Sequence, residues 1–501
     1  MREDIPDIIR RWAGVWACAA FALPLAAAKA EILAPPKPPA ADVQPFVKVR
    51  TGLIALTHAR LIDGTGAPEL SDQTIVIDGA KIARVLGPGV APPAGAKVID
   101  LTGRTVLPGL VGMHNHLFYV ARPDLDAEGH SQPPILAPQM TFSAPRMYLA
   151  AGVTTMRTTG SVEPYADLEL KRKIDSGELP GPHIDVTGPY LEGEGSPFVQ
   201  MHQLKDAEDA RRTVAFWADQ GATSFKAYMY ITRPELKAAI DEAHRRGLKI
   251  TGHLCAVTYP EAAELGIDDL EHGFFVNTQL DPGKTPDVCP DSSGDPTIEA
   301  MTPGNPAGTA LIALLIGRHV AVTSTLPVFE QDLPERAPLN PKALATLSPQ
   351  ALEAYLYARN RRALQSAKRR EEAKLQYAND IALERAFVAA GGLLLAGPDP
   401  TGNGGVLPGF GDQREVELLV DAGFTPEASI RIASYNGALF MGLAERIGSV
   451  ASGKDADLVV VSGDPAKSIA DIEKVEIVFK DGVGYDPAAL LDSVRGRFGE
   501  Y

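Results

Sequence analysis

Cysteine and positive charge are both scarce in this 501-residue sequence. Acidic residues outnumber basic ones by 63 to 48, and the resulting net charge of −15 gives no electrostatic reason to bind nucleic acid or anionic lipid. The mean hydropathy is close to zero, which excludes a membrane bundle. No internal repeat is evident. Two of the three cysteines, Cys255 and Cys289, lie outside the first thirty residues; they could pair in an oxidising compartment, or both could be buried thiols.

The first thirty residues differ from the rest of the sequence. Arg10 and Arg11 precede an apolar stretch from residue 12 to residue 28, and Ala28-Lys29-Ala30 follows. This order is typical of a secretory signal peptide that is cleaved after Ala30, and the apolar part is short for a membrane span. A retained N-terminal anchor is the alternative, and the arginine pair would also fit twin-arginine export. We therefore expect a periplasmic or secreted protein whose mature chain has no membrane span.

The two ends of the mature chain predict β-structure. Residues 31–45 are rich in proline and alanine and predict an extended lead-in. Residues 46–104 and 449–501 contain short β-branched runs that are broken by turn sequences such as Asp-Gly and Gly-Thr-Gly, a pattern that favours hairpins. These segments predict a small β-sandwich domain formed from both termini.

Residues 105–448 predict a different architecture. Eight short apolar runs, suited to buried parallel strands, alternate with amphipathic helical stretches. This alternation predicts an α/β fold, specifically a (β/α)8 TIM barrel. Two stretches are longer than a simple barrel needs, at 280–310 and 330–380, and we expect them to shape the mouth of a pocket. The second contains the sequence "RNRRALQSAKRREEAKLQ", which predicts a charged, solvated helix.

Ionisable residues of metal-ligand type occur at the carboxyl ends of five of the predicted strands. Each has an ordinary explanation on its own, as a structural histidine, an outward-reaching lysine or a helix cap. Together, at the end of a barrel where active sites lie, they predict a metal site. They are His114 and His116 after the first run, Lys226 in the fourth, His253 after the fifth, His272 after the sixth and Asp399 after the eighth.

The chemistry of this set favours two metal ions. Imidazole and carboxylate suit divalent zinc, manganese or iron, and we expect zinc. A buried ammonium beside two cations would be repelled, so Lys226 fits best as a carbamate formed with carbon dioxide. A carbamate is an anionic ligand that can bridge two metals. Two close metals lower the pKa of a shared water and make hydroxide available at neutral pH.

Three stretches carry a resemblance to a known family: "TVLPGLVGMHNH", "AGVTTMRTTG" and "IGSVASGKDADLVVVSGDP". They resemble the binuclear amidohydrolase superfamily, in particular its imidazolonepropionase-like and prolidase-like branch, over nearly the whole mature chain. The segment "GPYLEGEGSPF" departs from it, because it lacks the Gly-Gly-His-Gly element of many prolidase-like members. The resemblance implies the ligand assignment: His114, His116 and Asp399 for one metal, His253 and His272 for the other, and carboxylated Lys226 between them.

This arrangement implies a mechanism. A hydroxide that bridges the metals would attack a carbonyl, and Asp399 would act first as general base and then as general acid. Tyr228 or Tyr259 would donate a hydrogen bond to the oxygen that becomes negative, or would only pack in the pocket wall. Arg157 could bind a substrate carboxylate, or it could pair with an acidic residue such as Glu163 or Glu192.

The sequence therefore predicts an exported metal-dependent amidohydrolase that cleaves a small-molecule carboxamide: an N-acyl amino acid, a dipeptide or an aryl amide. A lactonase or esterase using the same binuclear site is the near alternative. A non-catalytic exported binding protein is the alternative from another class, and the complete ligand set argues against it. We expect a homo-oligomer.

Overall fold

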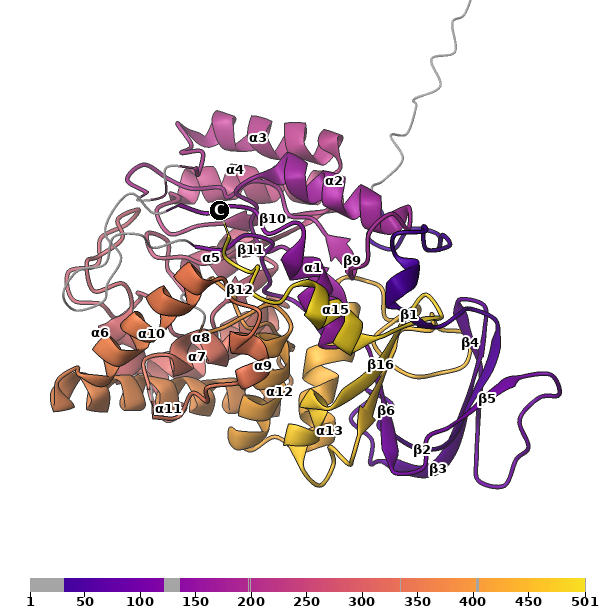
Figure 1. Cartoon of the computed structure of the whole chain (residues 1–501). Coiled ribbons are helices and arrows are strands. Elements are labelled where there is room, and N and C mark those ends of the chain that lie inside the picture. Colours follow the sequence, from indigo (N-terminus) through magenta and orange to yellow (C-terminus); the bar gives the residue numbers. More distant parts are fainter. Residues whose placement is uncertain are drawn as a thin grey trace, which may run out of the picture.

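The computed structural model describes residues 31–120, 136–196, 198, 200–333, 335–401 and 405–500. The predicted signal peptide lies outside these residues. Within them, no helix is both long enough and apolar enough to cross a membrane. Figure 1 shows a sheet-rich part built from both ends of the chain, next to a larger part in which helices surround parallel strands.

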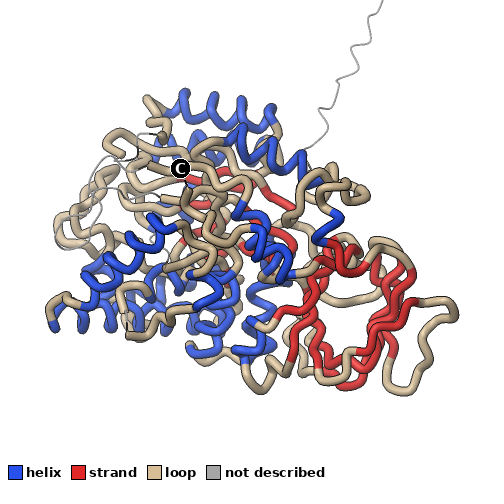
Figure 2. The backbone as a smooth tube through the Cα atoms, viewed as in Figure 1, coloured by secondary structure: helices blue, strands red, loops and turns tan. Residues whose placement is uncertain are grey.

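The strands of the two chain ends share one nine-stranded sheet. Its order is β1-β17-β16-β15-β6-β2-β3-β4, and β5 pairs with β2. The N- and C-terminal halves meet where β6 and β15 run antiparallel, with Leu107 opposite Val459. Figure 2 shows the sheet curling around its own interior, where Ile54, Ile75 and Phe479 are buried. The predicted pairing of the two termini is present, and the division into two sandwich layers stays a prediction. The bounds are β1 (Val47–Val49), β2 (Leu53–Leu61), β3 (Leu70–Asp78), β4 (Lys81–Leu86), β5 (Lys97–Asp100), β6 (Arg104–Pro108), β15 (Leu458–Ser462), β16 (Val475–Lys480) and β17 (Val483–Tyr485).

Eight parallel strands follow one another in the middle of the chain, one in each of the predicted apolar runs. They form a three-stranded sheet, β7-β8-β9, and a five-stranded sheet, β10-β11-β12-β13-β14. A parallel bridge between Thr187 and Ser224 connects the β9 edge of the first sheet to the β10 edge of the second. At the opposite edges of the two sheets, next to β7 and β14, the amide of Met113 donates a hydrogen bond to the carbonyl oxygen of Ala396 at 2.8 Å. The bounds are β7 (Leu110–Gly112), β8 (Val153–Arg157), β9 (His183–Asp185), β10 (Ser224–Ala227), β11 (Lys249–Gly252), β12 (Asp269–Glu271), β13 (Ala321–Ser324) and β14 (Leu394–Ala396).

Helices connect these strands, and local sequence fixes several of their ends. At the start of α5, Thr258 and Glu261 form a capping box, and Gly266 ends the helix in the left-handed conformation. Figure 1 shows α3 and α4 on one side of the parallel strands and α7 and α11 on the other. The bounds are α1 (Ser143–Ala150), α2 (Pro164–Asp175), α3 (Ala207–Gln220), α4 (Arg233–Arg245), α5 (Tyr259–Leu265), α6 (Asp295–Ala300), α7 (Pro306–Gly317), α8 (Leu326–Glu330), α9 (Pro341–Leu344), α10 (Pro349–Ala363), α11 (Ala367–Ala389), α12 (Phe410–Asp421), α13 (Pro426–Arg431), α14 (Gly437–Phe440) and α15 (Pro487–Ser493).

The prediction of one charged helix in the 330–380 stretch is wrong. The structure has two helices there, because α10 ends at Ala363 and α11 begins at Ala367. The side chain of Ser366 caps the second helix by accepting a hydrogen bond from the Arg369 amide at 3.1 Å. A serine that bonds the backbone in this way favours a new helix start over a continuous helix.

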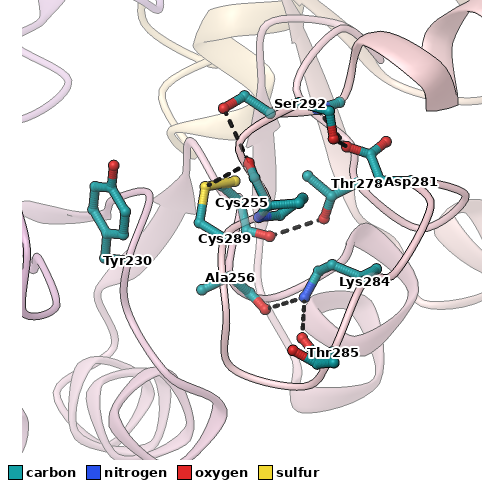
Figure 3. Close-up of a disulfide and its surroundings, with 12 residues drawn as sticks. Tyr230, Cys255, Ala256, Thr278, Asp281, Lys284, Thr285, Cys289 and Ser292 are labelled. Carbon is teal, nitrogen blue, oxygen red and sulfur yellow. Dashed lines mark hydrogen bonds between the residues drawn. A yellow bond between two sulfur atoms is a disulfide. The ribbon is translucent and has the colours of Figure 1, made fainter.

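Cys255 and Cys289 form a disulfide, with their Cα atoms 4.8 Å apart. The sequence left two alternatives open, a disulfide or two buried thiols, and the structure has the disulfide. Cys255 follows β11, and Cys289 belongs to the 280–310 stretch. Figure 3 shows two further contacts to the segment after β11, one from Thr278, just before the 280–310 stretch, and one from Lys284 within it. Thr278 Oγ1 donates to Cys255 O at 2.8 Å, and Lys284 Nζ donates to Ala256 O at 2.7 Å. The disulfide therefore ties the longer stretch to the chain two residues after His253.

We expect the disulfide to stabilise the fold. It closes a loop of 34 residues, for which the chain-entropy treatment gives about 3–4 kcal/mol. Replacing both Cys255 and Cys289 with alanine should lower the free energy of unfolding by an amount of this order, as measured by denaturant titration. Dithiothreitol should destabilise the wild-type protein and leave the double variant unchanged. An equal effect of the reductant on both proteins would contradict this prediction.

Candidate metal centre

The six predicted ligands line a single cavity at the carboxyl ends of the parallel strands. They come from five strands that are far apart in the sequence. The predicted set is therefore brought together in space, while the assignment of each residue as a ligand stays a prediction. His114 and His116 follow β7, Lys226 belongs to β10, His253 follows β11, His272 follows β12 and Asp399 follows β14.

Each histidine after β7 is oriented by a hydrogen bond at its Nδ1 atom. His114 Nδ1 lies 2.7 Å from Glu271 Oε2, and His116 Nδ1 lies 3.0 Å from Thr158 O. Since both partners are acceptors, each Nδ1 donates a hydrogen bond, and the Nε2 atom of each ring points into the cavity. Carboxylate or carbonyl partners of this kind commonly fix the orientation of metal-binding imidazoles.

Asp399 lies opposite these two nitrogens. Its Oδ1 atom is 3.1 Å from His116 Nε2 and 3.6 Å from His114 Nε2. Lys226 Nζ also lies 3.1 Å from His114 Nε2. Two imidazole nitrogens, a carboxylate oxygen and the lysine nitrogen thus lie together in the cavity, within reach of one cation.

The second pair of histidines adjoins the first. The ring centroid of His272 lies 4.6 Å from that of His114 and 4.4 Å from that of His253. Thr325 Oγ1 lies 3.0 Å from His272 Nδ1. His272 Nε2 is buried and has no hydrogen-bond partner. An unpartnered buried nitrogen of this kind is costly unless something outside the polypeptide, such as a metal ion, binds it.

Unusual backbone conformations accompany two of these residues. His272 and Asp399 have positive φ angles of 69° and 54°, which non-glycine residues adopt infrequently and which often accompany functional sites. Gly397, two residues before Asp399, packs directly on the first strand. A Cβ atom there would lie 2.2 Å from the backbone nitrogen of His114, so only glycine allows the two strands to approach this closely.

Burial governs the protonation of the histidines. Burial and the nearby Lys226 lower the pKa of His253 to about 3 and hold the pKa of His114 well below its usual value. Burial, and then the neighbouring His253, lower the pKa of His272 in the same way. Burial also lowers the pKa of Lys226, although Glu271 and Asp399 oppose this shift. His114, His253 and His272 are therefore neutral at pH 7, the form in which imidazole binds metals.

The donor set fits divalent metal ions. Ligand atoms of His114, His272 and Asp399 all lie within 4.8 Å of one another, and neutral imidazoles with a carboxylate are ligands that zinc, manganese and iron accept. The fit rests on three observations: the approach of His114 and His116 to Asp399, the unpartnered nitrogen of His272, and the lowered pKa of His114, His253 and His272.

Two predicted functional residues lie outside the cavity lining. Tyr259 is fully buried, and its hydroxyl donates to the carbonyl oxygens of Glu271 at 2.8 Å and Gly273 at 3.2 Å. Arg157 pairs with Asp185 at 3.1 Å and Asp269 at 3.4 Å rather than with Glu163 or Glu192. This geometry does not support an oxyanion role for Tyr259 or a carboxylate-binding role for Arg157. Tyr228, in contrast, lines the cavity.

The sequence analysis missed several residues of the site. Glu271 immediately precedes His272 and orients His114 from β12. Alternation could have revealed it, because Asp269 and Glu271 lie two residues apart and so face the same side of β12. The apolar wall was also missed, and no motif marked it. Its residues are Phe118, Val120, Val162, Tyr190, Phe198 and Met201.

Curated proteins match short parts of the chain. Imidazolonepropionase of Arthrobacter sp. (strain FB24) is 33% identical over 103 residues, which are 21% of this chain and 22% of that protein. Adenine deaminase 2 of Jannaschia sp. (strain CCS1) is 35% identical over 78 residues, 15% of this chain and 12% of that protein. The chain thus matches less than a quarter of the length of these relatives.

Solved structures match most of the chain. A Xaa-Pro dipeptidase with bound methionine in its active site is 21% identical, with 87% of this chain and 100% of that chain covered and a TM-score of 0.63. Bottromycin amidohydrolase is 20% identical, with coverages of 91% and 94% and a TM-score of 0.65. At these identities the likeness concerns the fold.

The family model described as "Amidohydrolase family" matches residues 105–288 and 401–483. Because these segments make up more than half of the sequence, the chain belongs to the amidohydrolase family.

Proposed function

We propose that this protein is a metal-dependent hydrolase that cleaves a carboxamide bond with two divalent ions, zinc by preference. The observation that carries the proposal is the cavity in which His114, His116 and Asp399 face one another beside His272, whose buried Nε2 atom has no hydrogen-bond partner. Membership of the amidohydrolase family supports it. The names of two structural neighbours, a dipeptidase and an amidohydrolase, agree with amide hydrolysis.

The residues divide into two groups around the proposed ions. His114, His116 and Asp399 would hold one ion, and His253 and His272 the other. When bound, such ions lower the pKa of water and polarise a carbonyl. Asp399 would receive a proton from the attacking water and transfer it to the leaving nitrogen, because its carboxylate lies in the cavity beside His116.

Lys226 would join the two groups as a carbamate. Its amine would add to carbon dioxide and lose one proton, giving an anion with two oxygen donors. Burial supports this step, because it lowers the pKa of Lys226 and so favours the neutral, nucleophilic amine. The amine lies 3.1 Å from His114 Nε2, within reach of the first group.

The cavity wall favours an apolar or aromatic substrate group. Phe118, Val162, Tyr190, Phe198 and Met201 line one side of it. Among the described lining residues, Lys226 is the only Lys or Arg. A free carboxylate on the substrate would therefore find no spare cation in this part of the chain. Of the three amide classes predicted, an aryl amide or an amide with a large apolar acyl group agrees best with this lining.

The wider organisation follows from the same proposal. Residues 105–448 would form a closed (β/α)8 barrel, supported by the contacts at both edges of the two parallel sheets. Residues 46–104 and 449–501 would form the β-sandwich. Export to the periplasm or the medium is supported by the disulfide, since disulfides persist in oxidising compartments. Assembly into a homo-oligomer stays a prediction.

A pooled-substrate experiment tests the function. Protein produced with zinc and bicarbonate is incubated with aryl amides, N-acyl amino acids, dipeptides, esters and lactones, and the products are followed by mass spectrometry. We expect cleavage of apolar or aryl amides. Lys226→Ala should lose bound metal and turnover together, whereas Lys249→Ala, at the exposed start of the neighbouring strand, should keep both. Cleavage of lactones alone would favour the lactonase, and equal turnover by the Lys226 variant would contradict the proposal.

Chemical rescue separates a carbamate from a simple amine at position 226. The Lys226→Ala variant leaves space in which acetate or formate can supply two oxygen donors. We expect these carboxylates to restore part of the metal content and turnover, and methylamine to restore neither. Metal content by mass spectrometry and the initial rate are measured together. Rescue by methylamine alone would show that the amine itself is required.

The two tyrosines give a matched pair of variants. Tyr228 lines the cavity, and its ring lies 4.9 Å from that of His253. If its hydroxyl stabilises negative charge in the transition state, Tyr228→Phe should lower kcat by roughly a hundredfold. Tyr259→Phe should instead lower the free energy of unfolding by about 1–3 kcal/mol, because it leaves the buried carbonyl of Glu271 without its donor. The opposite pattern would assign the oxyanion role to Tyr259.

A further inference from the structure

A second cluster of ligand-type side chains lies at the other ends of the parallel strands, next to the nine-stranded sheet. His183 is the first residue of β9, Asp457 immediately precedes β15, and Asp481 immediately follows β16. His183 and Asp457 are 2% and 5% exposed. The cluster shares no residue with the cavity at the carboxyl ends. It brings one imidazole and two carboxylates together from three distant parts of the chain.

These side chains are close together but are not hydrogen bonded to one another in the ordinary way. His183 Nε2 lies 3.3 Å from Asp481 Oδ1 and 3.8 Å from Asp457 Oδ2. Even so, His183 Nε2, Asp457 Oδ2 and Asp481 Oδ1 are buried atoms without a hydrogen-bond partner of suitable geometry. Three unsatisfied polar atoms that face one another would cost several kcal/mol if nothing were bound between them.

The opposite oxygen of each carboxylate is held by the protein. Asp457 Oδ1 accepts a hydrogen bond from the Asp481 amide at 2.8 Å. Asp481 Oδ2 accepts one from Lys480 Nζ at 2.9 Å. Each aspartate thus has one oxygen fixed by a donor and the other directed at His183. This is the arrangement by which surrounding residues orient the carboxylate ligands of a metal.

The distances suit a tetrahedral ion better than an ion pair. Bonds from zinc to nitrogen and oxygen of about 2.0–2.2 Å place neighbouring ligand atoms about 3.4 Å apart. The observed distances from His183 Nε2 to the two carboxylate oxygens, 3.3 Å and 3.8 Å, lie on either side of this value. A protonated His183 would instead have to direct its N–H bond at one oxygen, and the ring does not do so.

We propose that His183, Asp457 and Asp481 bind a divalent transition-metal ion, zinc by preference, that fixes the nine-stranded sheet to the start of β9. One imidazole nitrogen with two carboxylate oxygens suits zinc or manganese, whereas calcium prefers oxygen ligands alone. Because the ligands come from β9 and from one end of the antiparallel β15–β16 pair, the ion joins the two parts of the molecule. Its role would be structural.

Metal counting tests this site without relying on activity. Wild-type protein loaded with zinc and freed of excess metal should hold one more ion per chain than His183→Gln or Asp457→Asn. Both variants should keep the ions at the cavity. Lys226→Ala should show the reverse, losing cavity ions and keeping this one. His58→Gln is the matched control, because it removes an exposed imidazole that belongs to neither cluster, so it should keep the ion. Equal zinc content in the wild type and both ligand variants would overturn the proposal.

Crystals of the zinc-loaded wild type provide a second measurement that does not depend on how the variants fold. Anomalous scattering above the zinc absorption edge should give a peak between His183 Nε2 and the two aspartate oxygens. Chelation should also lower the thermal unfolding temperature of Lys226→Ala, in which this ion alone remains. No peak at the cluster while the cavity is occupied would sink the inference. A peak at the cluster with an empty cavity would support it and count against the proposed hydrolase.

Discussion

The charge of a buried lysine is the constraint on which the candidate centre depends. Lys226 is 1% exposed and lies 3.1 Å from His114 Nε2, and among the described residues it has no salt-bridge partner at contact distance. Burying an unpaired ammonium costs several kcal/mol. The carboxylates of Glu271 and Asp399 oppose that cost electrostatically. The lysine is therefore tolerable as a cation only with these two acids in place, and as the proposed carbamate it would carry a negative charge that bound metal ions compensate.

The strands below the cavity carry a polar network that holds those acids. Thr251 Oγ1 donates to Glu271 Oε1 at 2.6 Å, which leaves Oε2 for His114. Deeper still, Arg157 pairs with Asp185 and Asp269. A network with many satisfied members fixes side-chain positions more firmly than single contacts do. In the structure Arg157 thus contacts the acids beneath the cavity, and a substrate-binding role for it stays a prediction.

The sequence allowed the strands and the set of candidate ligands to be predicted, because both depend on local pattern. Apolar runs define the strands, and parallel strands bring residues that follow them to one end. Arg157 could not be assigned from its own segment, since its partner Asp185 is set by the pairing of β8 with β9. The orientation of the Tyr259 hydroxyl and the joining of Cys255 to Cys289 likewise depend on segments that only the fold brings together.

The two clusters at opposite ends of the strands use the same kinds of donor in different surroundings. At the carboxyl ends, the ligand-type residues line a cavity with an apolar wall, so a substrate could reach bound ions. At the amino ends, His183 and Asp457 are buried where the nine-stranded sheet packs against β9. Catalytic metal sites keep a coordination position open, whereas structural sites are closed by protein. The identity of the donors therefore does not distinguish the two centres. Access of substrate to the bound ions would make the centre at the carboxyl ends reactive, whereas the buried ion at the amino ends would only link the two parts of the molecule.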